Sequence, residues 1–226
     1  MPMDSLQALG VEVSLGTLVL SVDSHCNVTT QTRRERFDAV VIATGTLPAR
    51  PAFTGARKPG VFVLDSRLPC ELLREATARM RNVVVVGSET DSFVLADRLS
   101  EACPSVTHLP EVESPLNLFS DGVREMIRGA GSGRGVRFVQ SPPREVAGGL
   151  ERTEAVVAGD RVIACDAVVV IPRRLPRAPA SSARTGTSGG LAVDRNLQTS
   201  IPSTYAAGGC AEYPWAPRTC LPSIGR

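Results

Sequence analysis

The sequence predicts an α/β fold with a doubly wound, largely parallel sheet. Short runs of apolar, β-branched residues alternate along the chain with segments of helical spacing, and glycine stands at the ends of several runs. The 226 residues, 42% of them hydrophobic and 21% charged, are enough for one large or two small domains with a sizeable core.

The first part of the chain predicts strands and a loop. Residues 10–30 contain short alternating stretches separated by turn residues, which is typical of a small antiparallel meander. Residues 37–45, FDAVVIATG, form a continuous apolar run ending in Thr-Gly, and they predict a buried parallel strand followed by a tight turn. Prolines and glycines over residues 48–60 indicate an extended loop.

The middle of the chain predicts parallel strands joined by helices. Leu72, Leu73 and Ala76 share one face of the first helix by spacing. The second helix lies between two apolar strands, which is the pattern of a right-handed β-α-β crossover. In this region we expect helices over residues 69–80, 91–102 and 118–130, and strands over residues 82–87, 105–109 and 136–139.

The last part of the chain predicts hairpins, strands and one linker. Hairpins are expected over residues 144–164, with turns at Gly148-Gly149 and Gly159-Asp160. Residues 172–190 are rich in Pro, Arg, Ser and Gly, a composition that favours a mobile loop or linker. Further strands are expected over residues 166–171, 191–194 and 204–208.

Charge and hydropathy narrow the class of partner. The formal net charge of +2 indicates neither a nucleic acid nor an anionic membrane as partner. The longest apolar runs are far shorter than the roughly 20 residues that a membrane span needs. The first ten residues lack the pattern of a secretion signal, so we expect a cytoplasmic protein, without excluding an organelle.

Cysteine and histidine do not predict a metal or catalytic site. The two histidines, His25 and His108, lie far apart in the sequence, and no nucleophile motif accompanies them. The cysteines form no C-x-x-C pair, so free, mainly buried thiols are expected. These cysteines are Cys26, Cys70, Cys103, Cys165, Cys210 and Cys220.

Four segments, in order, resemble the FAD- and NAD(P)-dependent pyridine nucleotide-disulfide oxidoreductases, the family of NADH oxidases and ferredoxin reductases. They are FDAVVIATG at 37–45, RNVVVVG at 81–87, DAVVVI at 166–171 and VDRNLQTSIPSTYAAGGCA at 193–211. The resemblance implies a Rossmann-like FAD/NAD(P)-binding fold in which an NAD-type domain is inserted into a partial FAD-type domain. It implies FAD-type parts over residues 1–72 and 186–226, and an NAD(P)-type domain over residues 73–185.

The resemblance also implies where cofactors are contacted. FAD contacts would fall on the turn Ala43-Thr44-Gly45 and on Gly208 and Gly209, and NAD(P) contacts on Gly87 and Glu111. Glu111 lies near the position where a carboxylate binds the ribose about 20 residues after the fingerprint.

The cofactor motifs depart from the family pattern. Where G-x-G-x-x-G is expected, residues 87–92 read GSETDS, so only Gly87 remains. The carboxylates of Glu89 and Asp91 would repel a pyrophosphate, and Ser92 should hold the helix further from the strand. Gly209 stands where the family has an aspartate beside the flavin. These departures predict weak cofactor binding.

Three interpretations follow. In the first, the chain is an oxidoreductase that acts with a partner supplying the rest of the flavin site. In the second, it is a non-catalytic, cofactor-free structural or assembly subunit that keeps the fold. In the third, it is a fragment of a longer enzyme. A partner protein or a second copy would cover the incomplete FAD-type domain, because truncation exposes strand edges and apolar faces.

Overall fold

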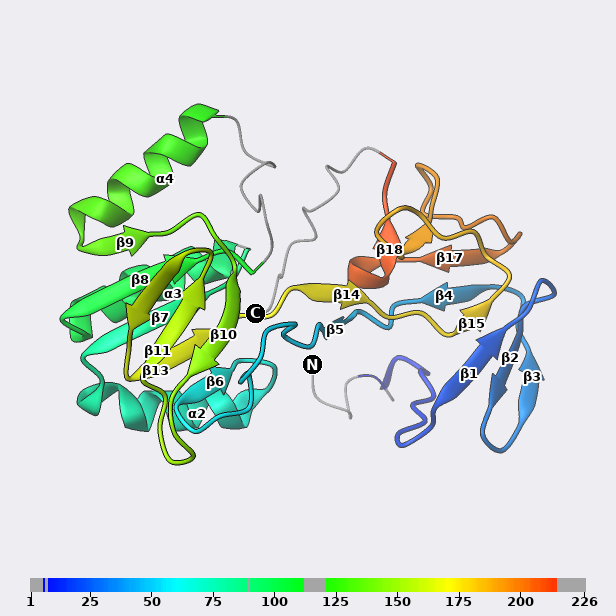
Figure 1. The fold of residues 1–226 in the computed structure, drawn as a ribbon. Helices are drawn as coiled ribbons and strands as arrows, with labels where there is room; N and C mark the ends of the chain where they lie inside the picture. Colours follow the sequence, from blue (N-terminus) through cyan, green and yellow to red (C-terminus); the bar gives the residue numbers. More distant parts are fainter. Residues whose placement is uncertain (1–5, 7, 89, 112–120, 215–226) are drawn as a thin grey trace. The chain divides into compact units, whose positions relative to one another are not determined.

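The chain forms two compact units in the computed structural model, which describes residues 6, 8–88, 90–111 and 121–214. Unit 1 comprises residues 1–47 and 175–226, and unit 2 comprises residues 48–174 (Figure 1). The chain passes between the units in β5 (Thr46–Pro48) and β14 (Arg174–Pro176), which pair as a two-stranded sheet.

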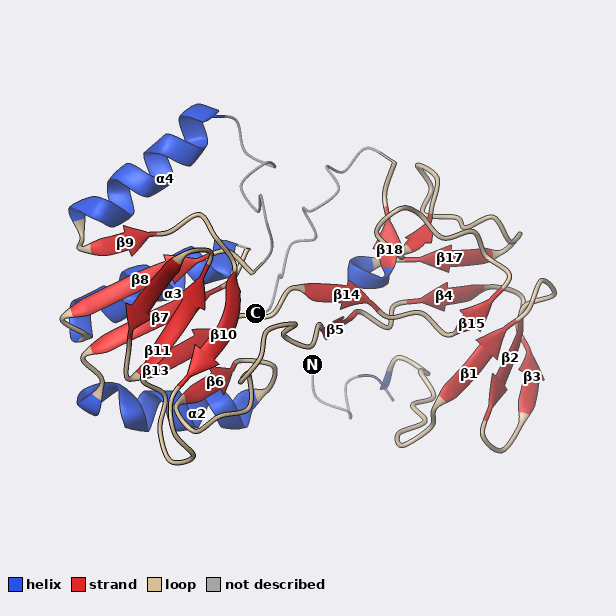
Figure 2. Ribbon diagram, viewed as in Figure 1, coloured by secondary structure: helices blue, strands red, loops and turns tan. Residues whose placement is uncertain are grey.

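Unit 2 is built on a five-stranded parallel sheet with the order β6-β13-β7-β8-β9 (Figure 2). The strands are β6 (Val61–Val63), β7 (Asn82–Val86), β8 (Ser105–Leu109), β9 (Val136–Phe138) and β13 (Ala167–Val170). The helices are α2 (Arg67–Ala76), the 3-10 turn η1 (Thr77–Arg79), α3 (Thr90–Ala102) and α4 (Asp121–Gly133). The predicted α/β class with parallel strands is confirmed.

The two faces of this sheet are covered differently. Val83 and Val85 of β7 belong to a core cluster with Leu73 of α2 and Ala96 and Leu99 of α3. The alternate side chains of β7 face a second cluster, formed with an antiparallel meander. Both faces of β7 are therefore buried, which explains its unbroken run of valines. The meander consists of β10 (Pro143–Ala147), β11 (Ala155–Ala158) and β12 (Arg161–Ala164), which form the two hairpins expected over residues 144–164.

One expectation for unit 2 needs correction. Leu72 was expected on the buried face of its helix, but it is 49% exposed, because the neighbouring Leu73 points into the core instead. The helix expected over 118–130 is α4, which begins at Asp121 in the described part of the chain. The two compact units divide at 47/48 and 174/175, and the pairing of β6 with β13 in the central sheet places residues 48–72 in unit 2. The domain bounds that the family resemblance implies, at 72/73 and 185/186, stay a prediction.

The described residues of unit 1 form three small sheets around one core cluster. The strand β1 pairs with β2 and β2 with β3 in the expected antiparallel meander, and β15 adds to β1 in parallel. The strands are β1 (Val19–Val22), β2 (Asn27–Thr30), β3 (Arg34–Arg36), β4 (Val40–Ile42), β15 (Ala180–Ser181), β16 (Leu191–Ala192), β17 (Thr204–Ala206) and β18 (Ala211–Glu212). A 3-10 turn, η3 (Gly208–Cys210), precedes β18.

The segment 37–45 is less buried than expected. The strand β4 pairs in parallel with β17, as the sequence pattern predicts, and Ile42 enters the core. Val41, however, is 65% exposed, because its side of β4 has no covering layer among the described residues.

The segment 172–190 is not simply a linker. It contains β14 and β15, and its last part surrounds a carboxylate. Glu212 accepts hydrogen bonds from the backbone N–H groups of Thr187 and Ser188, both at 2.8 Å, and from both hydroxyls. A Cβ on Gly186 would lie 2.1 Å from Cδ of Glu212, so a side chain at position 186 would displace this carboxylate. Although burial opposes it, these hydrogen bonds lower the pKa of Glu212.

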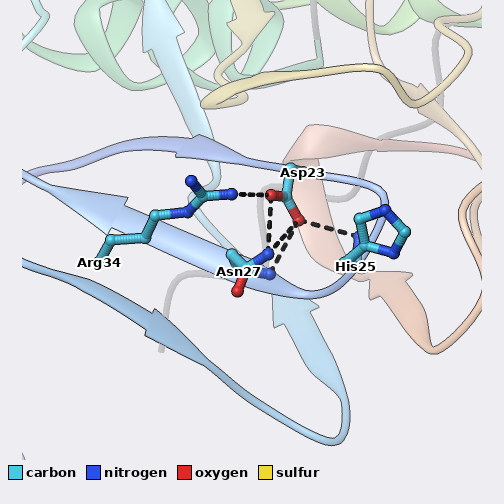
Figure 3. Close-up of polar contacts among 4 residues, drawn as sticks. All are labelled: Asp23, His25, Asn27 and Arg34. Carbon is cyan, nitrogen blue, oxygen red and sulfur yellow. Dashed lines mark hydrogen bonds and ion pairs between the residues drawn. The ribbon is translucent and has the colours of Figure 1, made fainter.

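A second carboxylate organises the turn between β1 and β2 (Figure 3). Asp23 accepts hydrogen bonds from the backbone N–H and side-chain amide of Asn27, at 3.0 Å and 2.8 Å, and from the N–H of His25 at 2.9 Å. Arg34 of β3 forms an ion pair with it at 2.6 Å. The Asn27 side-chain and backbone hydrogen bonds hold the pKa of Asp23 well below its ordinary value of 3.8.

Candidate functional site

The carboxyl ends of β13, β7 and β8 meet at one edge of the sheet in unit 2. The N–H of Gly87 donates to the carbonyl of Leu109 at 3.0 Å, and the N–H of Ile171 donates to the carbonyl of Val86 at 2.8 Å. In open parallel sheets, ligands bind in the crevice outside this edge. The sequence-predicted residues Gly87 and Glu111 are both placed here, directly after β7 and shortly after β8.

Gly87 lets helix α3 approach the end of β7 closely. A Cβ added to Gly87 would lie 2.4 Å from the Cβ of Ser92, so the missing side chain of Gly87 makes room for the side chain of Ser92. Ser92 is fully buried. The expectation that Ser92 holds the helix away from the strand therefore overlooks Gly87, which accommodates Ser92 at this contact.

The Ser92 hydroxyl is hydrogen-bonded to His108, a contact that the sequence did not indicate. The Oγ–Nε2 distance is 3.0 Å, and the imidazole stacks on Phe93 with ring centroids 4.4 Å apart. Burial lowers the pKa of His108 to about 4, so the ring is neutral at physiological pH. A Ser–His pair can activate a nucleophile, but both residues are buried beyond the reach of a substrate. The pair joins helix α3 to strand β8 inside unit 2.

Contacts with Ser88 and Arg173 hold Glu111 at the strand ends. Its backbone N–H donates to Oγ of Ser88 at 3.0 Å, and its Oε2 accepts from the backbone N–H of Arg173 at 2.8 Å. Ser88 follows β7 and Arg173 follows β13. The carboxylate that was expected to meet a ribose is thus engaged by the chain itself.

At this edge of the sheet, the backbone arrangement suits a dinucleotide, but the negative charge of a nearby carboxylate does not. Strand β7, the turn at Gly87 and helix α3 provide the strand–turn–helix arrangement whose helix N-terminus attracts phosphate. Asp91 lies in the first turn of α3 and opposes an anion there. The other carboxylate invoked from the sequence, Glu89, lies outside the described residues.

In unit 1 the structure brings together Ala43-Thr44-Gly45 and the turn Gly208-Gly209. The N–H of Ala207 donates to the carbonyl of Ile42 at 3.0 Å, and a Cβ on Gly209 would lie 2.6 Å from Cγ2 of Thr46. The Thr44 hydroxyl donates to the carbonyl of Arg177. These turns therefore contact each other closely.

The described residues of unit 1 do not by themselves fit a flavin. The N–H of Gly208 donates to the hydroxyl of Tyr213 at 3.1 Å, so it is already bonded within the chain. The carboxylate side chain that the family pattern has at position 209 would require Thr46 to shift, because a Cβ there would lie 2.6 Å from its Cγ2. Cys210 is fully buried, and its thiol donates to the carbonyl of Ile42 at 3.2 Å.

The described part of the chain was also compared with the requirements of a reactive thiol, a metal site and a membrane span. Four of its cysteines, Cys26, Cys103, Cys165 and Cys210, are buried and free, while Cys70 is free and exposed. Burial raises the pKa of Cys165 to about 12, which keeps its thiol protonated. Within residues 6, 8–88, 90–111 and 121–214, no three His, Cys, Asp or Glu side chains are placed to hold a metal ion. No helix in these ranges is long and apolar enough to cross a membrane.

A parallel sheet with a glycine turn leading into a helix defines unit 2 as a Rossmann-like, nucleotide-binding type of fold. The family model of pyridine nucleotide-disulphide oxidoreductases matches residues 3–222. The chain belongs to this family.

Known relatives are longer than this chain. An NADH oxidase of Methanocaldococcus jannaschii is 26% identical over 224 residues, which cover 93% of this chain and 50% of that protein. The crystal structure of a ferredoxin reductase from Rhodopseudomonas palustris has a TM-score of 0.79 at 24% identity, and the match covers 94% of this chain and 54% of the reductase chain. A putidaredoxin reductase, solved in a covalent complex with putidaredoxin, has a TM-score of 0.78 at 20% identity. This match covers 94% of this chain and 54% of the matched chain. The chain spans about half the length of these relatives.

Proposed function

We propose that this chain is an oxidoreductase-family protein that supplies a nicotinamide-nucleotide unit and part of a flavin unit, and that it is active only when a further segment completes the flavin unit. The observation that carries the proposal is the side of β4 that no layer of described residues covers. A parallel strand is normally buried on both faces, yet Val41 is 65% exposed. Unit 1 also exposes Leu18, Leu20, Phe37 and Leu47.

The proposed completing segment is a partner polypeptide or a second copy of this chain. The relative solved with putidaredoxin supports the idea that proteins of this fold work with protein partners. The net charge of +2 does not favour a nucleic acid as that partner. A cytoplasmic location is part of the same proposal.

The proposed role of unit 2 is to bind NADH or NADPH at the carboxyl ends of β7 and β8. Gly87 would permit the close turn, and the start of α3 would face the pyrophosphate. The chemistry supplied at the completed site would be hydride transfer from nicotinamide to flavin. This chain would orient the nucleotide, and no residue is assigned a catalytic role.

The test is a paired binding measurement. The purified chain is titrated with FAD, followed by visible absorbance, and with NADH and NADPH, followed by calorimetry. The same is done for the complex isolated from its natural source. We expect measurable NADH or NADPH binding by the chain, and flavin absorbance only in the complex. A complex without flavin would contradict the proposal.

A second candidate is a non-catalytic, cofactor-free subunit. It is favoured by the closed turn at Gly208-Gly209, where Thr46 and Tyr213 occupy the contacts. This candidate predicts a complex that forms normally but contains neither flavin nor nucleotide. Micromolar NADH binding by the chain would argue strongly against it.

A further inference from the structure

Glu111 connects two strands that are not neighbours. It follows β8, and its carboxylate accepts the N–H of Arg173, which follows β13. In the sheet order β13-β7-β8, the strand β7 lies between them. All three strands are parallel, so the side chain of Glu111 spans the carboxyl end of β7.

The same residue is tied to the middle strand as well. Its backbone N–H donates to Oγ of Ser88, which directly follows Gly87. One residue therefore joins the ends of all three strands at the edge where a parallel sheet binds its ligand. A charge-assisted hydrogen bond from a backbone N–H to a carboxylate is among the stronger ones in proteins.

We propose that Glu111 is a clasp across the carboxyl ends of β13, β7 and β8 in unit 2, and that it must release Arg173 before a nucleotide can bind at this edge of the sheet. The inference rests on the proposed nucleotide-binding function. It gives Glu111 a role opposite to that of a ribose ligand. A ribose ligand would strengthen binding, whereas a clasp weakens binding because its contact must first be broken.

Variants of Glu111 separate the clasp from simple charge repulsion. Glu111→Asp keeps the charge but shortens the side chain by one methylene, so it should no longer reach the N–H of Arg173. Glu111→Ala removes both the charge and the contact. Glu111→Gln removes the charge, but its amide oxygen can still accept the hydrogen bond.

The matched control is Glu154→Gln. Glu154 is also a carboxylate of unit 2 and pairs with Arg152 at 3.0 Å. Its carbonyl accepts the N–H of Cys165, close to the amino end of β13, so it lies toward the opposite edge of the sheet.

The experiment measures two quantities on the full chain: the affinity for NADH by calorimetry, and the exchange rate of the Arg173 amide hydrogen by NMR. We expect faster exchange at Arg173 in Glu111→Asp and Glu111→Ala, and at least tenfold tighter NADH binding in both. Both the exchange rate and the NADH affinity of Glu111→Gln should lie between those of these two variants and those of the native chain. Glu154→Gln should match the native chain in both quantities.

Three results would overturn the clasp. Unchanged exchange at Arg173 would mean that the contact does not exist in solution. Faster exchange with equal or weaker NADH binding, while the native chain binds NADH, would leave the proposed function standing and remove the clasp. Faster exchange with no NADH binding by any form would remove the nucleotide-binding function itself, and the clasp's gating role with it.

Discussion

Ser92 and His108 form a buried polar pair whose cost of disruption can be measured. Removing the hydroxyl in Ser92→Ala leaves Nε2 of His108 without this partner, since the Oγ–Nε2 distance is 3.0 Å in the native chain. An unsatisfied buried polar group costs about 1–3 kcal/mol, and we expect the free energy of unfolding to fall by that amount in denaturant titrations. Ser100→Ala, on the same helix but only half-buried, should change it by less than about 1 kcal/mol. Equal effects of the two variants would contradict this view.

His108 should also make stability depend on pH. Its folded pKa of about 4 lies below its ordinary value of 6.5, so the folded state favours the neutral ring. The free energy of unfolding therefore has its full value above pH 6.5 and decreases as the pH falls toward 4. The reason is that the unfolded chain takes up a proton in this range, whereas the folded chain does not. We expect a loss of about 2–3 kcal/mol over this range. In His108→Gln, the pH dependence of unfolding between these values should be smaller by that amount.

Asp23 should make the stability of the fold depend on pH in a lower pH range than His108 does. Its folded pKa is lowered, so its contribution is present above its unfolded value of 3.8 and is lost as the pH falls below it. We expect Asp23→Asn to lower the melting temperature at pH 7, while at pH 2 the difference from the native chain shrinks. Asp160→Asn, in the exposed turn between β11 and β12, is the control for charge alone. A difference that persists unchanged at pH 2 would argue against the role given to Asp23.

At the scale of elements, the contact between α3 and β7 depends on a matched pair of residues. In Gly87→Ala the new Cβ would lie 2.4 Å from the Cβ of Ser92 and 3.2 Å from the carbonyl oxygen of Ile171. Overpacking of this kind costs typically about 1–3 kcal/mol. We expect Gly87→Ala/Ser92→Gly to be more stable than the sum of the two single variants predicts, as measured by a double-mutant cycle. Additive effects would show that the two residues are not coupled.

The same elements show which parts of the fold could be predicted from the sequence. Unbroken valines in β7 and the apolar run of β8 predicted buried parallel strands, because burial of both faces leaves a direct mark in the sequence. Leu72 was misplaced because two adjacent leucines give the same periodicity, and only packing decides which one is buried. The strands β14 and β15 were missed because their partners lie far away in the sequence and their composition is that of a loop.

The candidate site was less predictable than the fold. Gly87 could be located from its position at the end of an apolar run. The contacts of Glu111 with Arg173, of Gly209 with Thr46 and of Ser92 with His108 join residues from separate elements, and no local pattern records such pairs. The family pattern located Glu111, Gly209 and Ser92 but did not indicate that other residues of the chain contact them.

At the scale of the whole molecule, each unit has its own core. The two core clusters that enclose the central sheet contain only residues of unit 2, and the third cluster contains only residues of unit 1. We expect residues 48–174, produced alone, to fold with the circular dichroism of a mixed α/β protein and to unfold in one cooperative transition. A gradual, non-cooperative melt would mean that unit 2 depends on unit 1.

The interruption of unit 1 by unit 2 has a consequence for the order of folding. The pairings of β4 with β17 and of β1 with β15 join segments separated by all of unit 2, so these are contacts of high sequence separation. While unit 2 is unfolded, closing so long a loop costs conformational entropy. Once unit 2 has folded, the N–H of Ala49 donates to the carbonyl of Arg173 at 2.8 Å, so the two ends of the insertion lie side by side. During synthesis, unit 2 can therefore form first and act as a short connection around which the two halves of unit 1 meet.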